Sequence, residues 1–146
     1  MPALKTGPAA RDGDEGSSGI LHILVVEDHA DTRRGMELFL QALGHWTQVA
    51  VGLQAALDLA ARSDTRFDLL LSDLRLPDGN GWDLLRRLEA AGCRPQRAIA
   101  ISGWSSETDV AKSISAGFQG HLVKPVNPNT LEAVLAKAAE EMKSLP

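Results

Sequence analysis

Several residue types are scarce in this chain of 146 residues, and each scarcity excludes a class of protein. The one cysteine, Cys93, rules out an internal disulfide framework and a zinc site built from several cysteines. Basic residues are outnumbered, 15 Lys and Arg against 19 Asp and Glu, so the basic surface typical of nucleic-acid binding is missing. No apolar run approaches the roughly 20 residues that cross a bilayer. We therefore expect a cytoplasmic protein without membrane insertion and without nucleic-acid contacts.

The two ends of the chain have few large apolar residues, which sets the expected domain boundaries. Residues 1–19 are rich in Gly, Pro, Ala, Ser and charged residues, and they have no apolar core of a secretory signal. Such a stretch buries too little surface to offset its ordering entropy, so we expect a flexible lead or linker. Apolar density begins at Ile20. We expect one folded domain over residues 20–143 and a short tail over residues 144–146.

Inside this domain, five short apolar runs alternate with five helical patterns. The run Leu21–Val26 is too short for a helix, and the residues after it repeat apolar side chains at the spacing of one helix face. Continuous apolar strands that alternate with helices predict a parallel sheet covered on both faces. The predicted fold class is α/β, with a doubly wound five-stranded parallel sheet. The further predicted strands are Trp46–Val51, Phe67–Ser72, Arg97–Ser102 and Gly120–Val123, and the predicted helices are 31–43, 53–61, 82–91, 108–116 and 129–143.

Polar residues of a particular kind follow these predicted strands. Parallel sheets bind ligands beyond the carboxyl ends of their strands, so all of these side chains belong to one edge. Each residue also has an ordinary structural explanation, and Asp28 alone is equally well read as a helix N-cap. Together they bring three carboxylates, one hydroxyl and one ammonium group to the same place. The residues are Glu27, Asp28, Asp73, Ser102 and Lys124.

The chemistry of this set points to phosphoryl transfer. Three neighbouring carboxylates repel one another unless a cation lies among them, and oxygen ligands suit Mg²⁺ better than Zn²⁺. A lysine and a serine can bind phosphoryl oxygens, and a carboxylate can act as a nucleophile. The pattern therefore predicts a site at which an aspartate is phosphorylated, with a metal and a lysine stabilising the transferring charge.

Four segments resemble the receiver domain of two-component response regulators. The resemblance covers about Leu21 to Glu141 and implies the flavodoxin-like receiver fold and a phosphoryl-accepting signalling function. By this resemblance, Asp73 is the phosphoacceptor and Lys124 binds the phosphoryl group. The segments that carry it are ILVVEDH (Ile23–His29), LLLSDLRLPDGNGWDLL (Leu69–Leu85), AISG (Ala100–Gly103) and GHLVKPV (Gly120–Val126).

The same resemblance assigns further roles. It implies that Mg²⁺ or Mn²⁺ is held by Glu27, Asp28, Asp73 and the backbone carbonyl of Arg75. It implies that Ser102 moves toward the phosphoryl group and that the peptide bond before Pro125 is cis.

One position departs from the family pattern. Receivers usually carry Tyr or Phe three residues before the lysine, whereas this chain has His121 there and no tyrosine at all. The resemblance gives His121 a switching role beside Ser102, and the alternative is a partly exposed strand residue. Trp104 either shields an acyl phosphate from water or is an exposed loop or partner contact, and Trp82 is a structural or partner-facing anchor.

The resemblance also implies partners. The expected phosphodonor is a histidine kinase or a histidine phosphotransfer domain, and a homodimer would use the face formed by the fourth helix, fifth strand and fifth helix. The flexible, acidic lead separately suggests the C-terminal receiver of a longer protein such as a hybrid histidine kinase, and the alternative is a stand-alone regulator that begins at Met1.

Two alternative functions remain open. A phosphohydrolase of the same chemistry generally needs an Asp where this chain has Arg75, so we expect self-phosphorylation and dephosphorylation without turnover of external substrates. A degenerate receiver would act only as a protein-interaction module, and the complete set of strand-end residues argues against it.

Overall fold

The computed structural model describes residues 20–62, 66–103 and 107–143. The predicted flexible lead over residues 1–19, the tail over residues 144–146 and Trp104 lie outside the described residues. Within the described ranges, no helix is long and apolar enough to cross a membrane.

Five parallel strands form the central sheet, in the order β2-β1-β3-β6-β7. The chain runs from β1 to one edge at β2 and then returns past β1 to β3, so the strand order reverses between β1 and β3. The carboxyl ends beside such a reversal are where doubly wound sheets bind ligands. The strands are β1 (His22–Val26), β2 (Trp46–Ala50), β3 (Leu69–Asp73), β6 (Arg97–Ser102) and β7 (Gly120–Val123).

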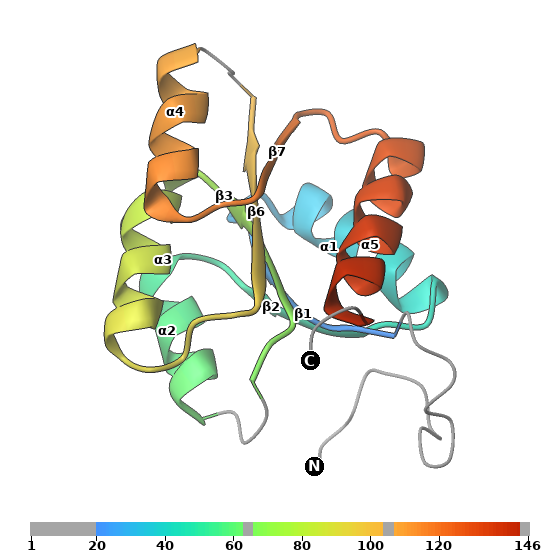
Figure 1. The fold of residues 1–146 in the computed structure, drawn as a ribbon, viewed down its shortest axis with the longest axis horizontal. Helices are drawn as coiled ribbons and strands as arrows, with labels where there is room; N and C mark the ends of the chain where they lie inside the picture. Colours follow the sequence, from blue (N-terminus) through green and yellow to red (C-terminus); the bar gives the residue numbers. More distant parts are fainter. Residues whose placement is uncertain (1–19, 63–65, 104–106, 144–146) are drawn as a thin grey trace.

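Helices cover both faces of the sheet, as Figure 1 shows, which confirms the predicted fold class. One face carries α1 (Ala30–Ala42) and α5 (Pro128–Lys143). The other carries α2 (Leu53–Arg62), α3 (Gly81–Ala90) and α4 (Glu107–Ala116).

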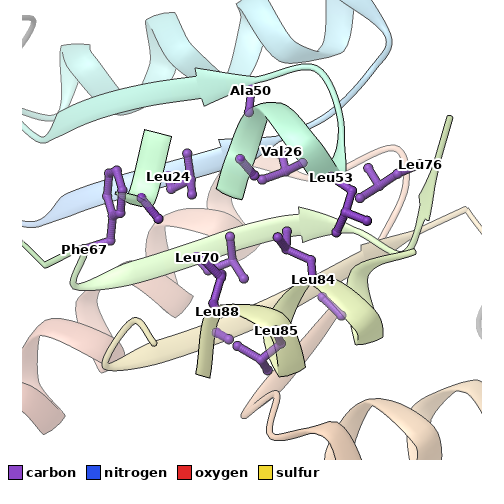
Figure 2. Close-up of a cluster of buried hydrophobic side chains, with 14 of the residues drawn as sticks. Leu24, Val26, Ala50, Leu53, Phe67, Leu70, Leu76, Leu84, Leu85 and Leu88 are labelled. Carbon is purple, nitrogen blue, oxygen red and sulfur yellow. The ribbon is translucent and has the colours of Figure 1, made fainter. Parts of the chain in front are cut away.

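The continuous apolar strands result from burial on both faces. In β1, Ile23 and Val25 pack into the core beneath α1 and α5, whereas Leu24 and Val26 pack into the core on the opposite face. Figure 2 shows this second core, in which Leu24 and Val26 of β1 lie in one cluster with Leu70 of β3, Leu53 of α2 and the leucines of α3. Because both faces are covered, the strands show no polar alternation.

A small antiparallel ribbon, β4 (Arg75–Leu76) and β5 (Gly79–Asn80), follows β3, where the residue types from Pro77 to Gly81 predict only a turn. Asp78, in the turn of this ribbon, accepts hydrogen bonds from the backbone N–H groups of Leu53 (2.7 Å) and Gln54 (3.0 Å). The bond from Gln54, and then that from Leu53, lowers the pKa of the Asp78 carboxyl. Asp78 therefore caps α2 from a distance and fixes the segment that follows Asp73.

Candidate functional site

The ammonium group of Lys124 joins two buried carboxylates at the carboxyl edge of the sheet. Its Nζ atom lies 2.8 Å from Oε1 of Glu27 and 2.8 Å from Oδ2 of Asp73. The Glu27 and Asp73 side chains are only 1% and 8% exposed, whereas that of Lys124 is 21% exposed. These three residues come from the ends of β1, β3 and β7, so the fold brings together groups that are far apart in sequence.

Backbone contacts fix the position of Asp73. It is the last residue of β3, one residue beyond the predicted strand end, because β3 continues to pair with β6 as far as Ile101. The next N–H group, of Leu74, donates to the carbonyl of Ile101 (2.9 Å). A side chain at Gly81 would place its Cβ atom 2.8 Å from the carbonyl oxygen of Asp73, so the start of α3 needs a glycine there.

Charge neutralisation keeps Lys124 protonated. Burial alone would disfavour the charged ammonium, but the hydrogen bond and charge of Asp73, and those of Glu27, outweigh it and raise the pKa of Lys124 above its ordinary value. Lys124 is therefore a permanent cation at neutral pH. It can neutralise a second anion that approaches Asp73, such as a phosphoryl group.

Asp28 does not cap the helix that follows it. The N-cap of α1 is His29, which makes no side-chain capping bond, so the N-cap interpretation of Asp28 is wrong. The Asp28 side chain is 35% exposed, so its carboxylate can bind a cation that arrives from solvent.

Two neighbouring residues organise the loop between β1 and α1, which carries Glu27 and Asp28. Sequence reasoning gave neither of them a role in the site. The His29 backbone N–H donates to Oε2 of Glu27 (3.0 Å). The Arg33 guanidinium donates to the backbone carbonyls of Glu27 (3.1 Å) and Asp28 (3.2 Å). Arg33 lies one helical turn into α1 and resembles an ordinary solvated arginine in the sequence, but it holds the loop that carries both carboxylates.

The acidic residues fit a hard divalent cation. Glu27, Asp28 and Asp73 carry three negative charges against the one positive charge of Lys124, which leaves room for further cationic charge. One ligand atom from each of Glu27, Asp28 and His29 lies within 4.8 Å of the others. Carboxylate oxygens at a site that Asp28 leaves partly exposed suit Mg²⁺, which keeps several waters. The donor set therefore agrees with the Mg²⁺ that receiver domains use.

Ser102 and Arg75 each contact a residue of the site through a backbone group. Ser102 ends β6, is 4% exposed, and its carbonyl accepts the backbone N–H of Lys124 (2.9 Å). The Arg75 N–H donates to Oδ1 of Asp73 (3.2 Å), while the Arg75 side chain is exposed. The peptide bond between Lys124 and Pro125 is cis.

His121 lies in β7, three residues before Lys124, opposite Ala100 in the register with β6. Both of its ring nitrogens are buried, and neither has a hydrogen-bond partner among the described residues. A buried polar group without a partner costs about 1–3 kcal/mol. The imidazole is therefore held in an unfavourable environment.

We expect His121→Phe to raise the free energy of unfolding by about 1 kcal/mol or more, because it removes both unpartnered nitrogens. Urea denaturation followed by circular dichroism measures the change.

His45→Phe is the matched control for this substitution. His45 is buried, and burial lowers its pKa, while its Nδ1 accepts the backbone N–H of Leu21 (3.0 Å). Its replacement should therefore destabilise the protein. A loss of stability in His121→Phe would show that its nitrogens have favourable partners.

Comparison with known proteins agrees with this geometry. The model of the response regulator receiver domain matches residues 23–136. The response regulator protein PilR of Pseudomonas aeruginosa is 34% identical over 116 residues, which are 79% of this chain and 25% of PilR. The sensory/regulatory protein RpfC of Xanthomonas campestris is 29% identical over 128 residues, which are 86% of this chain and 17% of RpfC. This chain therefore spans a quarter or less of the length of these two relatives.

A solved structure agrees over nearly its whole length. The CheY-like response regulator receiver domain protein of Methanospirillum hungatei superposes with a TM-score of 0.74 at 26% identity, over 86% of this chain and 99% of that one. The sheet order, the strand-end residues and the family match lead to one assignment. The chain belongs to the response regulator receiver domains, the phosphoryl-accepting domains of two-component systems.

Proposed function

We propose that Asp73 is the residue that accepts the phosphoryl group, from a phosphohistidine of a histidine kinase or a histidine phosphotransfer domain. The observation that carries this proposal is the shared contact of Lys124 Nζ with Asp73 and Glu27, 2.8 Å from each carboxylate. This contact supports the proposal because it puts the proposed nucleophile, a cation and the carboxylate proposed to bind the metal side by side.

The proposed reaction is an in-line transfer of the phosphoryl group from the donor histidine to Asp73. An oxygen of Asp73 forms a bond to phosphorus, the bond from phosphorus to the donor imidazole nitrogen breaks, and that nitrogen keeps the electron pair. Bound Mg²⁺, held by Glu27, Asp28, Asp73 and the backbone carbonyl of Arg75, would neutralise charge on the phosphoryl oxygens. Lys124 leaves its pairing with Asp73 to bind a phosphoryl oxygen. Water later hydrolyses the acyl phosphate and restores Asp73, without turnover of external substrates.

The proposed response begins at Ser102 and His121. Ser102 donates to the phosphoryl group, and the His121 imidazole leaves the environment in which its two ring nitrogens have no partner among the described residues. The surface that would change is formed by α4, β7 and α5. Ile114 of α4 and Val123 of β7 are 66% and 48% exposed there, so apolar surface is available for a homodimer.

The wider context belongs to the same proposal. RpfC is a sensory/regulatory protein, and this chain matches only 17% of its length. We propose that the chain acts as the receiver of a hybrid histidine kinase. It would work in the cytoplasm, where ATP supplies the phosphoryl groups of such relays, and its acidic balance supports no nucleic-acid contact.

A metal titration tests the proposal. We expect acetyl phosphate to phosphorylate the chain only with Mg²⁺, and chelation by EDTA to stop the reaction. Glu27→Gln and Asp28→Asn should each raise the Mg²⁺ concentration needed for half-maximal phosphorylation by about tenfold or more, since even outer-shell changes weaken metal sites this much. Intact-mass spectrometry measures the phosphorylated fraction.

Glu132→Gln is the control for the metal titration, because Glu132 is exposed on α5. Its Mg²⁺ requirement should equal that of the wild type. Full phosphorylation in EDTA, or an unchanged requirement in both pocket variants, would contradict the proposed metal site.

A further inference from the structure

A surface groove of about 430 Å³ lies between α3 and α4, on the face of the sheet opposite α1 and α5. Trp82 and Arg86 of α3 line one side, and α4 lines the other along its length from Thr108 to Ala116. None of the strand-end residues of the proposed phosphorylation site lines the groove, so it is a separate feature of the fold.

Trp82 forms a fixed apolar wall of this groove. Its Nε1 atom donates to Oγ of Ser113 (3.0 Å), a residue of α4 that is only 2% exposed. The Nζ atom of Lys112 lies 5.0 Å from the centre of the indole ring. These contacts hold the indole in place, so a ligand would pay little to order it.

The groove has one cation that is available to an anionic ligand. Arg86 is already paired with Asp83, at 2.7 Å. Lys112 is exposed, and within the described part of the chain no carboxylate pairs with it. No acidic residue is among the described residues that line the groove. A carboxylate beside an apolar group would complement Lys112 and the indole together.

The shape of the groove favours a peptide over a small anion. The stretch from Thr108 to Ala116 rises roughly 12 Å along α4, which matches three or four residues of extended chain. Thr108 and Ser115 of α4 also line the groove, and their hydroxyl groups can bond to peptide backbone groups. An inorganic anion would use Lys112 and leave the apolar wall uncovered.

We propose that this groove docks an acidic segment of a partner protein, in which a carboxylate side chain binds Lys112 and a neighbouring apolar side chain packs on Trp82. Docking of this kind does not depend on phosphorylation. It should persist in Asp73→Asn, so its failure and the failure of the phosphoacceptor assignment are distinguishable.

The test uses a blocked hexapeptide in which glutamate and leucine alternate. The indole N–H resonance of Trp82, assigned with Trp82→Phe, reports binding by NMR. We expect a saturable shift of this resonance, and we expect Lys112→Glu to weaken binding by about tenfold or more. Arg87→Glu, an exposed change on α3 away from the groove, should leave the affinity within about twofold.

Other outcomes would overturn the proposal. They are an absent shift, equal binding by a lysine–leucine hexapeptide, and unchanged affinity in Lys112→Glu. An equal shift with inorganic phosphate would assign the groove to small anions instead. A shift that appears on concentrating the protein without peptide would assign it to a second copy of the chain.

Discussion

Asp73→Asn is expected to reduce phosphorylation by acetyl phosphate and Mg²⁺ by a factor on the order of 1,000 or more, as other nucleophile substitutions do. The amide keeps the size of the side chain but lacks the charged oxygen that attacks phosphorus. Asp73 is nearly buried and ends β3, so no other described carboxylate takes its place in the strand. Intact-mass spectrometry over time measures the rate.

Asp58→Asn provides the matched control, because Asp58 is exposed on α2 and accepts a hydrogen bond from the Gln54 side chain. It should be phosphorylated at the wild-type rate. Circular dichroism checks that both variants are folded. Phosphorylation of Asp73→Asn at the wild-type rate would refute the role of Asp73.

Lys124→Met should lower the free energy of unfolding substantially. It leaves Glu27 and Asp73 buried with no cation between them. Removing one partner of a buried pair costs about 3–5 kcal/mol, and the 21% exposure of Lys124 lowers our expectation to about 2–4 kcal/mol. Urea denaturation at pH 7 in EDTA measures the loss. Adding Mg²⁺ should restore part of it, because the metal binds the folded state.

The raised pKa of Lys124 determines how its contribution to stability changes with pH. The pKa of Lys124 is raised in the folded protein, so its contribution to stability is complete below its ordinary value of 10.5 and is lost as pH rises through the folded value.

Lys137→Met, an exposed change on α5, is the control for Lys124→Met and should alter stability by less than about 0.5 kcal/mol. Adding Glu27→Gln to Lys124→Met should recover stability. If it costs more instead, the carboxylate repulsion is not the cause.

Much of the fold could be predicted because each strand is a short, continuously apolar segment, which is typical of a strand buried on both faces. The run ILVV supplies residues to both cores, and no polar alternation interrupts it. The β4–β5 ribbon could not be predicted, because its position depends on Asp78 bonding to the start of α2, 25 residues earlier. Local turn residues predict a turn there but not the element that the turn caps.

The site divides in the same way. The strand-end residues were predictable because a parallel sheet collects them at one edge. The contact that unites them was not, since the distance from Lys124 to Glu27 and Asp73 depends on the packing of three strands. Arg33 and the Trp82–Ser113 bond were missed for a similar reason. An arginine or a tryptophan on a helix has many ordinary roles, and only the tertiary structure shows its partner.

Peptide mapping of the wild-type chain tests the central claim most directly. The protein is phosphorylated with acetyl phosphate and Mg²⁺, digested, and fragmented in a mass spectrometer to locate the added phosphoryl group. The account predicts one phosphoryl group, on Asp73, and none after treatment in EDTA. A phosphoryl group on another residue such as Ser102 or His29, or an unmodified chain in the presence of Mg²⁺, would contradict it.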